Sequence, residues 1–133
     1  SSTVVPAALF DDVTSAESSA GDIEYRCFYV HNANATLAMQ NAVVYIQANT
    51  TGNRIAIGVG TSAVNATETA VADENTAPAG VTFSQPATKG AGLALGNIPA
   101  GQHRAVWVRR TIGAATPASN DTYTLRVECD TAA

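Results

Sequence analysis

The chain has 133 residues, of which 46% are hydrophobic and 14% charged, and its formal net charge is −4. Its seven basic residues include a single lysine, which argues against the clustered basic surface that nucleic-acid binding requires, although a local basic patch stays open. No apolar run approaches the roughly 20 residues of a membrane helix, and the length fits one domain.

Strand-like segments bounded by turn residues follow one another along the chain, and helical periodicity is almost absent. Residues 4–13 are expected to form an arm or an edge strand, because Pro6 cannot donate a hydrogen bond to a ladder. The strands expected after it are 22–32, 36–48 with a bulge at Gln40 and Asn41, 54–60, 80–87, 92–98, 102–112 and 122–129. Residues 61–79 form the longest irregular segment, and a loop of that length in a compact domain usually has a function.

Alternation within these segments indicates which side chains share a buried face. The two clearest sets are Ile55, Ile57 and Val59, and Tyr123, Leu125, Val127 and Cys129. About seven or eight such strands, with no room for a βαβ crossover, predict an all-β fold. We expect a two-sheet antiparallel β-sandwich, either Ig-like or jelly-roll, that comprises residues 14–133 as one domain behind the arm 1–13.

Motifs that carry chemistry are not found. His31 and His103 have no neighbour at the HxH or HxxxH spacing of metal ligands, and neither GxSxG nor a P-loop occurs. Gly58 and Gly60 lie within a strand pattern, where glycine marks a bulge or a close approach of another backbone. The sequence therefore predicts no enzyme activity, no cofactor and no metal.

The segment HRAVWVRR, residues 103–110, has two interpretations. In the first it is a packed strand whose arginines meet carboxylates such as Glu24, Asp22 or Glu128 across neighbouring strands. In the second it is a contact surface, because Trp and Arg are favoured at binding hot spots. The candidate interface then comprises Arg104, Trp107, Arg109 and Arg110, together with Val4, Val5, Pro6, Leu9 and Phe10 of the arm.

Two cysteines, Cys27 and Cys129, lie in expected strands near opposite ends of the chain. Free buried cysteines behave as small hydrophobic residues. A disulfide is the other alternative, if the first long strand and the last strand pack together.

Three stretches, YRCFYVHNANATLAMQNAVVYI, LGNIPAGQHRAVWVRRTI and DTYTLRVE, resemble in their order immunoglobulin-like β-sandwich modules. The Cys…Trp…Cys order of true immunoglobulin domains is not matched, which keeps a jelly roll open. The residues that match are Leu95, Ile98, Pro99, Gly101 and Gln102 in the turn, and Asp121, Tyr123, Leu125 and Val127 in the last strand.

From about residue 9 to 129 the chain is also similar to the small all-β structural proteins of tailed bacteriophages, which include capsid decoration (cement) proteins. This resemblance implies a non-enzymatic virion protein, made in the host cytoplasm, that binds and stabilises the phage head. Its expected partners are further copies of itself, as a dimer or trimer, and the major capsid protein or another virion protein. A tail- or fibre-associated Ig-like module and a carbohydrate-binding or adhesin β-sandwich are the alternatives.

Overall fold

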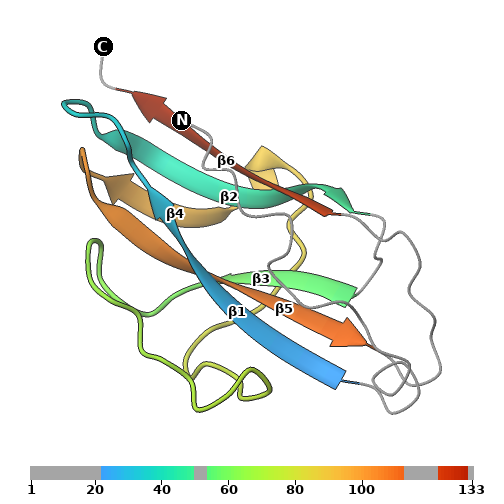
Figure 1. The fold of residues 1–133 in the computed structure, drawn as a ribbon. Coiled ribbons are helices and arrows are strands. Elements are labelled where there is room, and N and C mark those ends of the chain that lie inside the picture. The colour runs from blue at the N-terminus through green and yellow to red at the C-terminus, as the bar shows by residue number, and fades with distance from the viewer. Residues whose placement is uncertain (1–21, 50–53, 113–122, 132–133) are drawn as a thin grey trace.

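The computed structural model describes residues 22–49, 54–112 and 123–131. Its strands form two three-stranded antiparallel sheets, β1-β5-β3 and β4-β2-β6, which pack as the two layers of a sandwich (Figure 1). The all-β sandwich prediction is thereby confirmed. The strands are β1 (Asp22–His31), β2 (Met39–Asn49), β3 (Ile55–Val59), β4 (Leu93–Ile98), β5 (His103–Ile112) and β6 (Tyr123–Thr131), with a short 3-10 turn, η2 (Lys89–Ala91), before β4.

Consecutive strands alternate between the two sheets throughout the order β1 to β6. In an immunoglobulin-like domain the consecutive strands F and G lie in the same sheet. Each of the six described strands lies in the sheet opposite to that of the strand before it, so the last two, β5 and β6, lie in different sheets. The strand order therefore favours the jelly-roll alternative over the Ig-like one.

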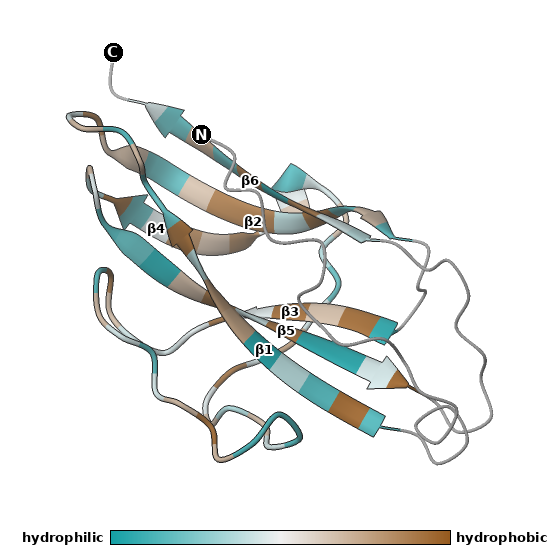
Figure 2. Ribbon diagram, viewed as in Figure 1, coloured by the Kyte–Doolittle hydropathy of each residue, from teal (hydrophilic) through white to brown (hydrophobic). Residues whose placement is uncertain are grey.

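The core between the sheets is formed by the alternating side chains that the sequence indicated. On β3, Ile55 and Ile57 are fully buried and Val59 packs beside them, and the apolar residues of β6 pack against the same cluster (Figure 2). Each fully buried Val, Leu or Ile side chain contributes about 1.5–3 kcal/mol. The other fully buried members are Ala42, Val44, Leu95, Ile98, Val106 and Val108.

The bulge expected in β2 is present. The register of β2 shifts between Met39 and Ala42 against β4, and Asn41 has a positive φ of 51°. Its N–H donates to Asn97 Oδ1 at 3.0 Å. Because of this bulge, Met39 and Ala42 both face the core although they are three positions apart.

The described residues contain fewer strands than the seven or eight expected. The expected arm or strand 4–13 lies outside the described residues, and 80–87 forms only an isolated bridge between Ser84 and Ile57. Two residues further on, Pro86 accepts a hydrogen bond from Ile46 of the opposite sheet. The segment thus leaves β3 after one bridge and crosses between the layers, which prevents a longer ladder.

Candidate functional site

The long segment 60–88, which we call the covering segment, lies along the outer face of the β1-β5-β3 sheet as far as about Thr82 and then crosses toward the opposite sheet (Figure 1, green to yellow). The N–H of Asn65 donates to His103 O at 2.7 Å, and the N–H of Gly60 donates to Ala105 O at 2.9 Å. A Cβ on Gly58 would lie 2.6 Å from Thr82 O. The close backbone approach that the glycines indicated is therefore real, and it is made by this segment.

The covering segment also occupies both edges of that sheet. At the β1 edge, Tyr25 N–H donates to Glu74 O at 2.7 Å. At the β3 edge, Ser84 and Ile57 exchange both backbone hydrogen bonds at 2.9 Å. Exposed strand edges are templates for pairing with other chains, so the segment closes this sheet to such pairing where it lies.

Glu68 has a buried carboxylate that accepts hydrogen bonds within the covering segment, and its backbone links the segment to the sheet. Glu68 is 8% exposed and accepts hydrogen bonds from the Thr61 hydroxyl at 3.0 Å and from the N–H groups of Ser62 and Thr69 at 3.3 and 3.1 Å. Its own N–H donates to the Tyr29 hydroxyl at 2.9 Å. Burial raises the pKa of Glu68, but these hydrogen bonds together lower it below its ordinary value.

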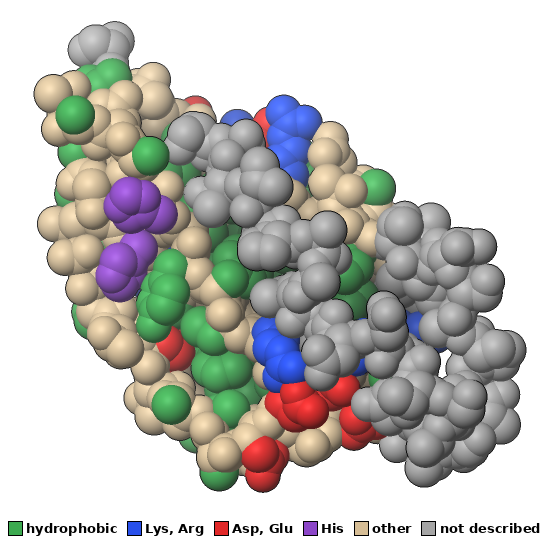
Figure 3. Space-filling view, in the orientation of Figure 1, with side chains coloured by type: hydrophobic (Ala, Val, Ile, Leu, Met, Phe, Trp, Pro, Cys, Tyr) green, Lys and Arg blue, Asp and Glu red, His purple; other side chains and the backbone are tan. Residues whose placement is uncertain are grey.

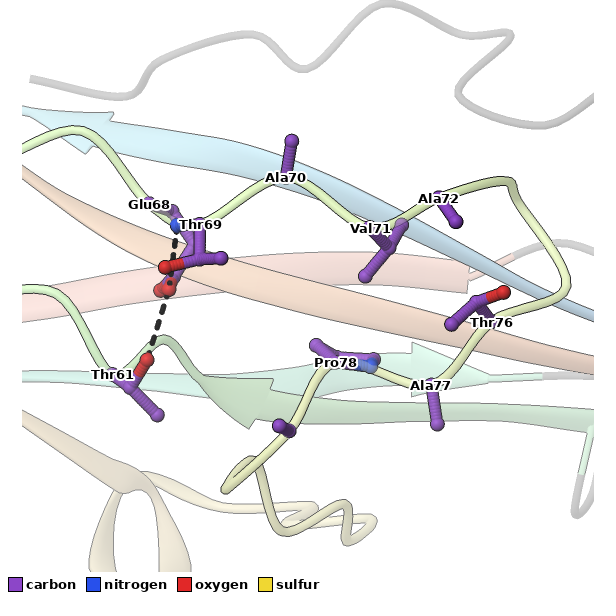
Figure 4. Close-up of a pocket in the computed structure, with 10 residues that line it drawn as sticks. Thr61, Glu68, Thr69, Ala70, Val71, Ala72, Thr76, Ala77 and Pro78 are labelled. Carbon is purple, nitrogen blue, oxygen red and sulfur yellow. Dashed lines mark hydrogen bonds between the residues drawn. The ribbon is translucent and has the colours of Figure 1, made fainter.

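A hollow of about 370 Å³ lies within the covering segment, and its lining includes Thr61, Glu68, Val71, Thr76 and Pro78 (Figure 4). Figure 4 shows the Thr61 hydroxyl directed at the Glu68 carboxylate. Because the oxygens of Glu68 accept hydrogen bonds from its own loop, the carboxylate holds the loop in shape. No group of three or more His, Cys, Asp or Glu side chains suited to a metal ion occurs in the described ranges.

Trp107 is only 4% exposed. The sequence had left two interpretations of this residue open, a packed strand residue and an interface hot spot. Trp107 lies on the outer face of β5, opposite Gly58 of β3, where the covering segment packs. On either side of it in the chain, Val106 and Val108 face the core and are fully buried. The burial of Trp107 fits the packing interpretation, and the contact-surface interpretation of this strand stays a prediction.

The arginines of the same strand are also engaged within the fold. Arg110 forms an ion pair with Glu24, its direct cross-strand partner, and the Glu24 side chain is 1% exposed. Burial raises the pKa of Glu24 although the charge of Arg110 opposes this shift. Arg109 packs over the Phe83 ring of the covering segment at 5.1 Å, and Arg104 is half-buried. The expected pairing of these arginines with Glu24 is thus confirmed for Arg110.

The other carboxylates proposed for those arginines lie elsewhere. Glu128 accepts a hydrogen bond from the Tyr45 hydroxyl at 3.0 Å and pairs with Arg126 at 3.3 Å. Asp22 accepts a hydrogen bond from the Asn75 amide at 2.6 Å. The arm residues of the candidate interface, Val4, Val5, Pro6, Leu9 and Phe10, lie outside the described residues.

Both cysteines are half-buried free thiols, and they lie in different sheets, so the disulfide alternative is not formed. Cys129 packs against the core. On the outer face of β1, burial and the nearby charge of Glu68 raise the pKa of Cys27 to about 11. A thiol with such a pKa is protonated at neutral pH and is a poor nucleophile.

The pairing of the two histidines is a feature that the sequence did not reveal. The register of β1 and β5 places His31 directly opposite His103. A search by spacing along the chain cannot find such a pair, because the two residues are brought together only by strand pairing. The cross-strand register was the missing signal.

Comparison with known proteins gave no match to a family model, to a curated protein or to a solved structure. The described residues contain no helix of the length and apolar character needed to cross a membrane.

Proposed function

We propose that this protein is a non-enzymatic virion structural protein of the capsid decoration (cement) kind. In this proposal it is made in the host cytoplasm and binds the outside of a phage head as a dimer or trimer, through contacts with the major capsid protein. Two things support this proposal: the resemblance of the sequence to phage structural proteins, and a difference between the two sheets in whether their outer strand edges are hydrogen-bonded.

The observation concerns the outer edge of β6. The covering segment forms a backbone hydrogen bond with Tyr25 at the β1 edge and a bridge with Ile57 at the β3 edge, whereas among the described residues no strand pairs with the outer edge of β6 or of the shorter β4. β6 has nine residues, which corresponds to an edge of about 30 Å at roughly 3.3 Å per residue. An extended segment of a partner can add to such an edge through main-chain hydrogen bonds, a recurring mode of recognition.

The side chains beside this edge fit the same role. The inward-facing residues of β6, Tyr123, Leu125, Val127 and Cys129, are only half-buried although they pack against the core. An added strand would bury more of their apolar surface, at about 25 cal/mol per Å². We therefore place the principal docking contact at the outer edge of β6.

The ionisable groups near the centre of the fold support a structural role. Glu24 and Arg110 neutralise each other between the sheets, and Glu68 shapes the covering segment. For the glycan-binding alternative, the burial of Trp107 removes the best stacking platform, and Tyr29 at 36% is the most exposed aromatic side chain in the described part of the chain. A tail- or fibre-associated module would use the same β6 edge and differs in the part of the particle that it binds.

The test is co-sedimentation of the purified chain with phage heads that lack it. Because the sequence also places the arm residues Val4, Val5, Pro6, Leu9 and Phe10 in the candidate interface, we expect binding to need the arm as well as the β6 edge. Removing residues 1–10 should therefore abolish binding, while the far-ultraviolet circular dichroism spectrum and the cooperative thermal transition stay unchanged. A matched control replaces the polar residues Ser1, Ser2 and Thr3 with alanine and should bind normally. Unchanged binding of the truncated chain, or binding to isolated tails but not to heads, would contradict the proposal.

A further inference from the structure

The structure assigns a transition-metal site to the cross-strand pair of His31 and His103, at the end of the β1-β5-β3 sheet. Both side chains lie on the outer face, and they lie side by side on the surface (Figure 3, purple). His31 is exposed and His103 is half-buried. The site is independent of the proposed function.

The backbone pairing brings these two side chains as close as antiparallel strands allow. The carbonyl of His103 accepts from Asn65 on the side away from β1, while Asn32 N–H donates to Gln102 O on the β1 side. His31 and His103 are therefore a pair without mutual backbone hydrogen bonds. In such pairs the Cα atoms are about 4.5 Å apart and the side chains are closest, so both imidazoles can reach one ion.

One contact orients each of the two imidazole rings. Nε2 of His31 lies 3.2 Å from Gly101 O, and because a carbonyl only accepts, this nitrogen carries the proton and Nδ1 carries the lone pair. Metal-bound histidines usually donate their other ring N–H to a carbonyl or carboxylate in this way. The His103 ring is held by an edge contact with Tyr29, at 4.7 Å between centroids.

The ligand set determines which ions fit. Neutral imidazole suits Zn²⁺, Ni²⁺ and Cu²⁺, whereas Mg²⁺ and Ca²⁺ require oxygen ligands. The described residues supply no cluster of three His, Cys, Asp or Glu side chains, so the ion is held by these two nitrogens and completes its shell with water. Such an ion would clamp the end of β1 to the start of β5.

The test is isothermal titration of the untagged chain at pH 7.5 with ZnCl₂ and NiCl₂, with MgCl₂ as the negative control. We expect one ion per chain, at least a tenfold weaker dissociation constant in both His31→Gln and His103→Gln, and no heat with Mg²⁺. The matched control Asp130→Asn alters an exposed residue of β6 and should bind as the unmodified chain does. Circular dichroism of each variant checks its folding.

Because His31 is exposed, its variant is expected to fold even if His103→Gln does not. Zn²⁺ should also shift the imidazole nitrogen signals of both histidines in NMR spectra of the unmodified chain. Absence of Zn²⁺ binding at 1 mM ion overturns the assignment. So does binding that is unchanged in His31→Gln, which would mean an adventitious ion only.

Discussion

Replacing Trp107 with alanine distinguishes a packed strand from a contact surface. Trp107 is 4% exposed, and its near neighbours on the outer sheet face, Ala56 and Ala105, are 2% and 0% exposed. Removing a buried indole from such surroundings leaves a cavity and costs about 3–5 kcal/mol. Total stabilities of domains are about 5–15 kcal/mol, so we expect the free energy of unfolding of Trp107→Ala to fall by a large fraction.

A second variant, Trp107→Phe, serves as the matched control. The indole Nε1 is buried and has no hydrogen-bond partner among the described residues, so phenylalanine removes volume without breaking a hydrogen bond between described residues. Its loss should be clearly smaller than that of Trp107→Ala, because the phenyl ring leaves a smaller cavity than a methyl group does.

The assay is urea unfolding followed by circular dichroism, because the alanine variant has no tryptophan fluorescence. Thermal unfolding should show a melting temperature lower by on the order of 15 °C for Trp107→Ala. A loss of less than about 0.5 kcal/mol, the usual range for surface substitutions, would refute the reasoning and restore Trp107 as a surface residue.

Three further predictions concern the covering segment and the ion pairs. Glu68→Gln should lower stability by about 1–2 kcal/mol at pH 7. Because the folded pKa of Glu68 is lowered, its contribution is complete above its unfolded pKa and is lost as the pH falls through the folded pKa. In a series of urea titrations at decreasing pH, the difference between the variant and the unmodified chain should therefore shrink. Gly60→Ala should lower the free energy of unfolding by more than about 1 kcal/mol, since the added Cβ would lie 1.9 Å from the Glu68 carboxylate. In thermal unfolding the matched control Gly90→Ala should be nearly neutral, because the atom nearest to its Cβ is 4.0 Å away. Arg110→Ala should lower the free energy of unfolding by about 3–5 kcal/mol, because it leaves the buried Glu24 carboxylate unpaired. Arg126→Ala should lower it by at most about 1 kcal/mol, because the side chains of its pair with Glu128 are 48% and 28% exposed. Equal losses in the two arginine variants would be inconsistent with a buried pair.

The elements that depend on local pattern could be predicted from the sequence. Alternation of Ile55, Ile57 and Val59 identified the core face of β3, and the polar pair Gln40 and Asn41 within an apolar run identified the bulge of β2. In both cases the physical cause, the two-residue period of a strand and its interruption, lies within a few residues.

Features that depend on distant segments could not be predicted. The sequence predicted an unusual loop at residues 61–79, but not its hydrogen bonds to Tyr25 of β1 and to His103 of β5, because these partners lie far away in the chain. The same is true of His31 and His103, which only the register of β1 and β5 brings together. Residues 80–87 have strand composition, yet they cross between the sheets, since Pro86 bonds to the sheet opposite β3.

We propose docking through the outer edge of β6, and the decisive test of this proposal compares amide hydrogen exchange of head-bound and unbound protein. Opening free energies vary along a structure, and pairing of an edge strand raises them locally. We predict that binding slows exchange in residues 123–131 and leaves the already paired amides of Tyr25, Ile57 and Ser84 unchanged. Protection that grows in the covering segment 60–88 while exchange in β6 stays the same would contradict the claim.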